Sequence, residues 1–217
     1  ISARYPIERR TPVTDLRTQE LVTLLGLAVA SPRGTRRAIG VEATGITACP
    51  CAQGLVRESA ADRLAEAGFS QAEIDRMFSL VPLATHNQRG RGTLVIGTNH
   101  RLRAEDLVEI VEQSMSSPIY ELLKRPDELF VVEQAHLQPR FVEDVVRQMV
   151  GQVLADHGSL LDEQDFVHAR QVNFETIHNH DVLAERSGTI GDLRRELATG
   201  ERSDGYLELR DWLQSPV

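Results

Sequence analysis

Three extended segments precede the first helical stretch of this chain, and this order constrains its fold most. Apolar residues alternate with polar ones over residues 1–7, and a second apolar stretch covers 22–30. After a turn at 31–34, the alternation returns over residues 39–43. A period of two residues is typical of strands with one buried face. The chain is therefore expected to begin with a run of strands.

Helices and short strands mix through the rest of the chain. Residues 54–80 are polar, rich in alanine and expected to be helical, with a helix start at Ser70. Residues 103–115 form an amphipathic pattern in which Glu112 is expected to face water, and Pro139 opens a helix with a valine stripe. Strands are predicted at 93–97, 129–132, 166–172 and 206–209. Such a mixture predicts an α+β fold.

Composition narrows the class of protein. The 217 residues fit one large domain or two small ones, and 41% of them are hydrophobic, which suffices for a sizeable core. The net charge of −8 argues against general nucleic-acid binding, which needs a basic surface. No apolar run approaches the ~20 residues that span a bilayer, so no membrane partner is expected. Unpaired cysteines without an export signal predict a cytoplasmic location.

The two cysteines of the chain lie one residue apart, in the segment Cys49-Pro50-Cys51. Three residues with a central proline seldom bring two Cβ atoms into disulfide geometry. Two thiols in one small region suit metal ligation or nucleophilic chemistry, and two inert buried cysteines are the alternative.

Four further polar segments are candidates for chemistry. The first follows an apolar stretch, the second precedes a predicted strand, the third is one glutamate beside the valine stripe, and the fourth ends a predicted strand: Thr85-His86-Asn87-Gln88-Arg89, Lys124-Arg125-Pro126-Asp127-Glu128, Glu143, and Asn173-Phe174-Glu175-Thr176-Ile177-His178-Asn179-His180. Each has a plain structural alternative. These are a solvated loop, a charged turn, an ion pair between Glu143 and Arg147, and a polar loop.

The residue types in these segments suggest a metal centre with proton carriers. Glu175 and His178 stand three residues apart and could act as a proton-transfer pair. Thiolate, imidazole and carboxylate groups with an open position suit Zn²⁺ or Fe²⁺. The remaining histidines have no comparable candidate groups beside them in the sequence and are interpreted as structural or surface residues: His100, His136, His157 and His168.

Taken together and in this order, these segments resemble the GTP cyclohydrolases of the IB type, including the archaeal enzymes of the methanopterin pathway. The stretch Gly45-Ile46-Thr47-Ala48, and the insertion between Cys51 and His86, are more similar to the archaeal branch than to the bacterial one. The resemblance covers residues 17–181.

The resemblance implies a tunnelling fold, in which antiparallel sheets with paired helices on one face close into a barrel through oligomerisation. Family members carry two such units per chain and form homotetramers. On this basis residues 1–35 would be the end of an N-terminal unit, and residues 36–217 a C-terminal unit with the active site.

The resemblance also implies roles for individual residues. Cys49, His86 and Glu128 would bind one divalent metal per subunit, Fe²⁺ or Zn²⁺, with Mn²⁺ as another option, and Cys51 would lie beside it. Glu143 would accept hydrogen bonds from the guanine edge, and His178 and Glu175 would carry protons. On charge alone, the triphosphate would be bound by Arg89, Lys124 and Arg125.

The implied reaction hydrates C8 of GTP, opens the imidazole ring and releases C8 as formate, giving a dihydroneopterin phosphate for folate or methanopterin synthesis. A bound metal lowers the pKa of water toward ~7, and His178 could protonate the departing nitrogen. One alternative is the nitrile reductase of the same fold family, against which the His-Asn-Gln-Arg loop and the paired cysteines argue. The other is a metal-stabilised purine- or pterin-binding oligomer without turnover, which formate release would exclude.

Overall fold

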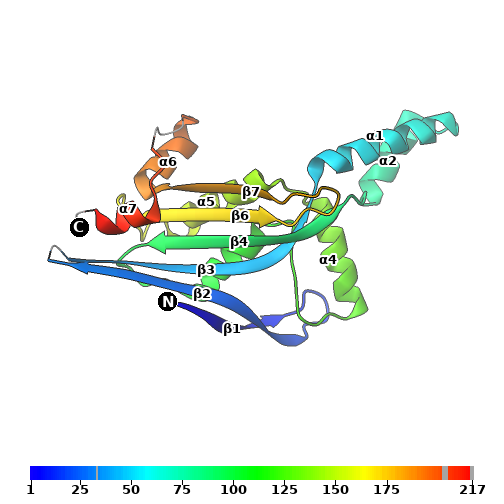
Figure 1. The fold of residues 1–217 in the computed structure, drawn as a ribbon. Coiled ribbons are helices and arrows are strands. Elements are labelled where there is room, and N and C mark those ends of the chain that lie inside the picture. The colour runs from blue at the N-terminus through cyan, green and yellow to red at the C-terminus, as the bar shows by residue number, and fades with distance from the viewer. Residues whose placement is uncertain (33, 202–204, 216–217) are drawn as a thin grey trace.

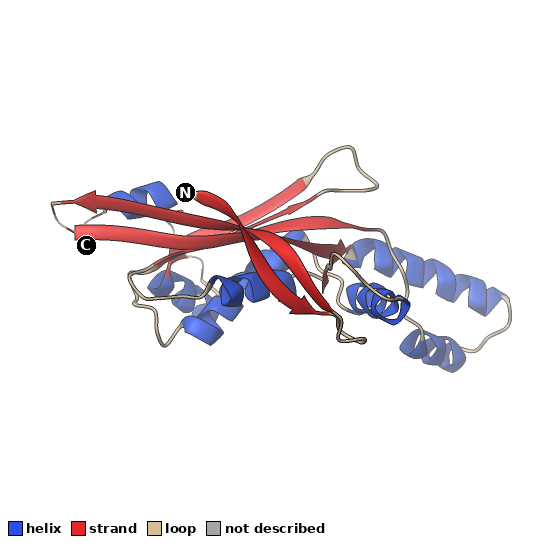
Figure 2. Ribbon diagram, turned by 90° about the horizontal axis from the view of Figure 1, so that it is seen from below, coloured by secondary structure: helices blue, strands red, loops and turns tan. Residues whose placement is uncertain are grey.

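The computed structural model describes residues 1–32, 34–201 and 205–215, and within them the strands form one twisted antiparallel sheet (Figures 1 and 2). The strand order is β1-β2-β3-β4-β6-β7, with the short β5 paired to β3. The strands are β1 (Ser2–Arg10), β2 (Arg17–Ser31), β3 (Gly34–Ala48), β4 (Asn87–Gly97), β5 (Ser117–Pro118), β6 (Phe166–Asn173) and β7 (Val182–Thr189).

The helices complete an α+β fold, as the sequence predicted. They are α1 (Pro50–Glu66), α2 (Gln71–Leu80), α3 (Ala104–Gln113), α4 (Arg125–Leu137), α5 (Val142–His157), α6 (Ile190–Thr199) and α7 (Leu209–Gln214). The first two strands pair directly into the same sheet as β3. The division at residue 35, the tunnelling fold and barrel closure by oligomerisation stay predictions.

The main core lies between one face of the sheet and the helices α3 and α5. The predicted valine stripe of α5 is buried along its whole length, from Val142 to Val153. It packs with buried residues of the central strands, among them Val41, Leu94 and Ala169. Burying one valine or leucine contributes about 1.5–3 kcal/mol, so this layer is the main source of the hydrophobic stabilisation.

The region 54–80 is helical, as predicted, but it forms two helices that project away from the sheet (Figure 1). The break is fixed by a capping box, in which the backbone N–H of Ser70 donates to Glu73 Oε2 at 2.8 Å. None of the residues of α1 is buried. This hairpin therefore contributes little to the core of the single chain.

Three sequence-based predictions were wrong. Residues 129–132 lie in α4 rather than in a strand, because Pro126 and the capping residue Asp127 start a helix ahead of a short apolar run whose periodicity is ambiguous. Residues 206–208 form no strand, and α7 begins at Leu209. Glu112 is 4% exposed because it forms an ion pair with Arg9 of β1.

Helix α7 covers one end of the sheet face opposite to α3 and α5. The ring of Trp212 packs on Phe166, with 5.7 Å between ring centroids, and the guanidinium of Arg36 lies 4.5 Å from the tryptophan ring. A side chain at Gly97 would collide with Trp212, because an added Cβ would lie 2.5 Å from the indole. The glycine therefore provides the space that the helix needs.

Candidate functional site

Three chain segments meet at one end of the sheet, at the right in Figure 1, and bring predicted site residues together. The last residue of β3 pairs with the first of β4, Ala48 with Asn87. At the same end β4 pairs with the end of β6, and the N–H of Phe174 donates to Arg89 O at 3.0 Å. Antiparallel pairing thus places three residues in one neighbourhood: Cys49 and His86, which adjoin their strands, and Glu175, two residues after the end of β6.

Cys49 caps the N-terminus of α1. Its Sγ accepts a hydrogen bond from Ala52 N at 3.4 Å, and its own N–H donates to His86 O at 3.3 Å. The sulfur therefore lies at the positive end of the helix dipole, where negative charge is favoured. Cys49 is partly exposed and Cys51 is exposed, and neither is in a disulfide. Neither cysteine is buried, so the burial expected in the alternative of two inert buried cysteines is not found.

A hydrogen-bonded chain connects His86 to Glu175. Nδ1 of His86 lies 3.2 Å from Gln88 Oε1, and Gln88 Nε2 donates to Glu175 Oε1 at 3.1 Å. Thr176 Oγ1 lies 3.4 Å from the same Nδ1. Gln88 is 6% exposed, while His86 and Glu175 are partly exposed. The chain combines an imidazole, an amide and a carboxylate within one hydrogen-bonded unit.

The third proposed metal ligand does not join this group within one chain. Glu128 is exposed in the first turn of α4. The far end of that helix is the one near His86, because His136 Nε2 lies 3.2 Å from Thr85 O. Glu128 precedes His136 by two helical turns, or about 12 Å along the axis.

Among the described residues, one group of three has ligand atoms within 4.8 Å of one another, namely His100, Asp162 and Asp165. This possible metal-binding triad lies away from Cys49 and His86, because His86 precedes β4 and His100 follows the opposite end of the same strand. Its members are already hydrogen-bonded: Asp165 Oδ2 accepts from Thr98 Oγ1 at 2.7 Å and from Asp162 N at 3.0 Å. His100 Nε2 lies 3.2 Å from Asp162 Oδ2. Because 62 positions separate His100 from Asp162, no local motif reveals the group.

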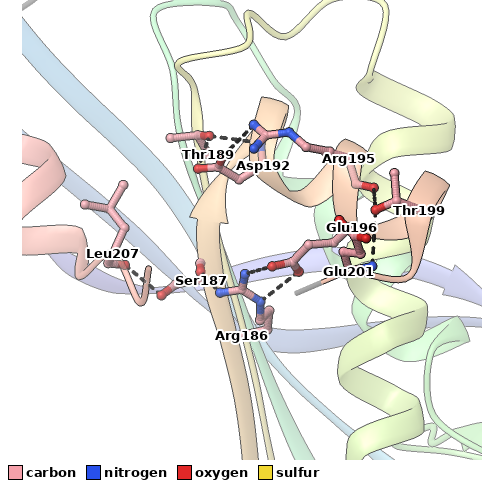
Figure 3. A network of polar contacts seen from close by, with 9 residues as sticks. All are labelled: Arg186, Ser187, Thr189, Asp192, Arg195, Glu196, Thr199, Glu201 and Leu207. Atoms are coloured by element: carbon pink, nitrogen blue, oxygen red, sulfur yellow. Dashed lines mark hydrogen bonds and ion pairs between the residues drawn. The ribbon is translucent and has the colours of Figure 1, made fainter. Parts of the chain in front are cut away.

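Glu143 lines a cavity of about 470 Å³ between α5, β7 and α6. Val146, Val150 and Leu193 form part of its apolar wall. The structural alternative for Glu143, an ion pair with Arg147, is not seen, since Arg147 instead donates to Asp144 at 2.8 Å. Contacts between Arg186 of β7 and Glu196 hold α6 in place (Figure 3).

The candidate phosphate ligands are divided between two places. Arg89 lines a cavity of about 440 Å³ beside Arg4, Arg91 and the carboxylates of Glu20 and Glu42. Lys124 and Arg125 are exposed at the start of α4 and do not line this cavity. The negative residues beside Arg89 make it a mixed-charge site.

His178 lies in the exposed loop between β6 and β7. Its ring stacks on that of His180, with 5.3 Å between centroids and 17° between planes. No hydrogen bond joins His178 to Glu175 in the described part of the chain. The proton-transfer pair therefore stays a prediction.

Sequence reasoning missed Gln88 and Asp127 as organising residues. Gln88 belongs to the polar segment, but only the alternation along β4 could have placed its side chain on the buried face with Gly90. Asp127 is 0% exposed and accepts hydrogen bonds from the backbone N–H groups of Val13 and Thr14, both at 2.9 Å. The available signal in the sequence was an aspartate at N3, the third residue of the helix, which is a typical capping position.

Comparison with known proteins places the chain in a family. Residues 1–184 match the family described as "Type I GTP cyclohydrolase folE2", and the chain belongs to this family. Similar curated proteins carry the name "GTP cyclohydrolase MptA". The protein from Methanococcus aeolicus is 43% identical over 200 residues, which are 89% of this chain and 64% of that protein.

Two further relatives with the same name agree. The protein from Methanosarcina acetivorans is 42% identical over 207 residues, and that from Methanocaldococcus jannaschii is 42% identical over 203 residues, each match covering 91% of this chain and 64% of the relative. The chain thus spans about 64% of the length of the curated relatives that it matches. Among the described residues, no helix is both long and apolar enough to cross a membrane.

Proposed function

We propose that this chain carries the active site of a GTP cyclohydrolase, which opens the imidazole ring of GTP by hydrolysis and releases C8 as formate. The product would be a dihydroneopterin phosphate, at the entry to folate or methanopterin synthesis. Family membership supports the reaction class. The observation that carries the proposal is the meeting of Cys49, His86 and Glu175 at one end of the sheet.

The residues at this end fit a divalent metal in part. Cys49 offers Sγ and His86 offers Nε2, and the backbone N–H of Cys49 donates to His86 O at 3.3 Å, which holds the two segments together. A thiolate and an imidazole suit Fe²⁺ or Zn²⁺. Such a metal, when bound, would lower the pKa of water toward ~7 and so supply hydroxide at neutral pH.

Glu128 remains the proposed carboxylate ligand, but it is remote from Cys49 in one chain. We infer that it would reach the metal from another copy of the chain in a homo-oligomer, for which a tetramer is the expectation. The exposure of Glu128 at the start of α4 is compatible with such a contact.

The other residues would bind and protonate the substrate. Glu143 would accept hydrogen bonds from the guanine edge, and Arg89, Lys124 and Arg125 would attract the triphosphate. Glu175 and His178 would move protons at the ring nitrogens, with Cys51 beside the metal.

Metal dependence tests this proposal. Protein purified without oxygen and loaded with Fe²⁺ or Zn²⁺ should bind about one metal per chain and release formate from GTP. Cys49→Ala removes the thiolate ligand and should lose both properties, whereas Cys51→Ala should keep its metal. The assignment fails if Cys49→Ala retains full metal occupancy and formate release.

A further inference from the structure

Gln88 is the one buried side chain that contacts both His86 and Glu175 among the described residues. Its carbonyl oxygen lies 3.2 Å from His86 Nδ1, and its amide nitrogen lies 3.1 Å from Glu175 Oε1. The side chain is held on the buried face of β4, at 6% exposure. Both contacts are made at the same end of the sheet as Cys49.

Hydrogen-bond chemistry fixes the direction of each contact. A carboxylate has only acceptors, so the amide N–H₂ of Gln88 must face Glu175 and its carbonyl oxygen must face His86. A carbonyl oxygen cannot donate, so Nδ1 of His86 carries a proton. Thr176 agrees, because its hydroxyl donates to Asn87 O at 3.3 Å and can then only accept from Nδ1. The lone pair of the imidazole is left on Nε2.

We propose that Gln88 is a positioning residue that fixes the Nδ1–H tautomer of His86, so that Nε2 faces a metal, and that holds Glu175 beside it. This inference rests on the proposed metal site at Cys49 and His86. Histidine ligands generally donate their second N–H to a carboxylate, carbonyl or water, which orients the ring. Here the side-chain carbonyl oxygen of Gln88 accepts from His86. The amide nitrogen of the same side chain donates to Glu175, so Gln88 orients both residues.

A neighbouring glutamine provides a matched control. Gln171 of β6 is 0% exposed and donates to Asn173 Oδ1 at 2.9 Å, beneath Gly90. It forms no hydrogen bond to His86 or Glu175 within the described residues. Loss of a buried amide at this position should therefore affect folding stability without changing the imidazole tautomer.

Three variants separate the contacts of Gln88. Gln88→Met keeps the approximate shape and removes both hydrogen bonds. Gln88→Glu keeps an acceptor toward His86 but places a carboxylate against Glu175. Combining Gln88→Glu with Glu175→Gln exchanges the amide and the carboxylate. The amide at position 175 can then donate to the carboxylate at position 88.

Two readouts test the proposal. In metal-free protein, ¹⁵N NMR of the histidine ring should show the Nδ1–H tautomer of His86 in the wild type, in Gln88→Glu and in the exchanged pair, and a shift toward Nε2–H in Gln88→Met. Chelator competition should show that Gln88→Met binds Zn²⁺ about 10- to 100-fold more weakly. Gln171→Met should keep both the tautomer and the affinity.

The outcomes are distinguishable. An unchanged tautomer in Gln88→Met overturns the proposal, as does an equal effect of Gln171→Met, which would reduce Gln88 to a general packing role. If the wild type binds no metal, the proposed function fails, but the tautomer measurement still decides whether Gln88 orients His86.

Discussion

At the scale of single residues, the site depends on where three strand ends place their flanking side chains. The local motifs around Cys49, His86 and Glu175 were visible in the sequence, and the structure brings these residues together. The link through Gln88 was not predicted, because it depends on the register between β4 and β6. Register is set by the hydrophobic pattern of both strands and by the connections between them, so the polar segment around Gln88 alone does not encode it.

His178 and His180 allow a residue-scale test of proton transfer. A proton carrier acts in the transition state, so its loss should lower turnover with little change in substrate affinity. His178→Ala should bind GTP and metal nearly as the wild type does, yet release formate about 10²–10⁴-fold more slowly. Single-turnover kinetics and equilibrium binding measure the two effects.

His180→Ala is the control, since its ring stacks on His178 but has no proposed proton role. Equal and near-normal rates in both variants would reject the Glu175 and His178 pair and make Cys51 the next candidate.

At the scale of elements, the length of each apolar repeat and the helix-capping residues determined which helices and strands could be predicted. The stripe of α5 follows a helical period over many residues, and the structure confirms it. The four residues 129–132 were too short a run to separate strand from helix, and the cap at Asp127 decided the outcome. β7 and α6 were not predicted, although α6 carries a readable signal: Thr189 caps its N-terminus, and its buried residues Ile190 and Leu193 stand at helical spacing.

Asp127 ties the start of α4 to the turn between β1 and β2. Burial alone would raise the pKa of this carboxyl, but hydrogen bonds from the Thr14 hydroxyl and from backbone N–H groups hold it well below its usual range. Its contribution to stability is present above the unfolded pKa of ~3.9 and is lost as pH falls through the lower folded value. Asp127→Asn should therefore melt at a lower temperature at pH 7.

Thermal unfolding over a range of pH measures this effect. The difference between wild type and Asp127→Asn should shrink as pH falls below ~4. Glu133→Gln, an exposed change on the same helix, should melt like the wild type. A melting temperature for Asp127→Asn equal to that of this control would show that the cap contributes nothing.

At the scale of the whole molecule, a buried ion-pair cluster joins the N-terminal strands to the helical layer. Arg9 of β1 contacts Glu112 of α3, and its Nε lies 3.1 Å from Glu20 Oε2 of β2. Burial raises the pKa of Glu112 to about 7, against the opposing effect of Arg9. One guanidinium thus faces two carboxylates in a poorly solvated place.

This cluster predicts a pH dependence of stability. The folded pKa of Glu112 is about 7, above the ordinary glutamate pKa of 4.5. The contribution of Glu112 to stability is therefore fully present below pH 4.5 and is lost as pH rises through the folded pKa. Between pH 5 and 8, the free energy of unfolding of the wild type should therefore fall relative to that of Glu112→Gln.

Denaturant titrations at several pH values provide the measurement. Glu133→Gln, an exposed change on α4 that does not act on Glu112, should keep the wild-type pH profile. A constant difference between wild type and Glu112→Gln across this range would contradict the raised pKa.

We propose that this end of the sheet opens the imidazole ring of GTP. The most direct measurement follows GTP labelled with ¹³C at C8 by NMR, using metal-loaded protein, with mass spectrometry of the product. We expect the label to leave as formate, with one formate for each dihydroneopterin phosphate formed. Recovery of the label in unchanged GTP, or in a product that keeps C8, would contradict it.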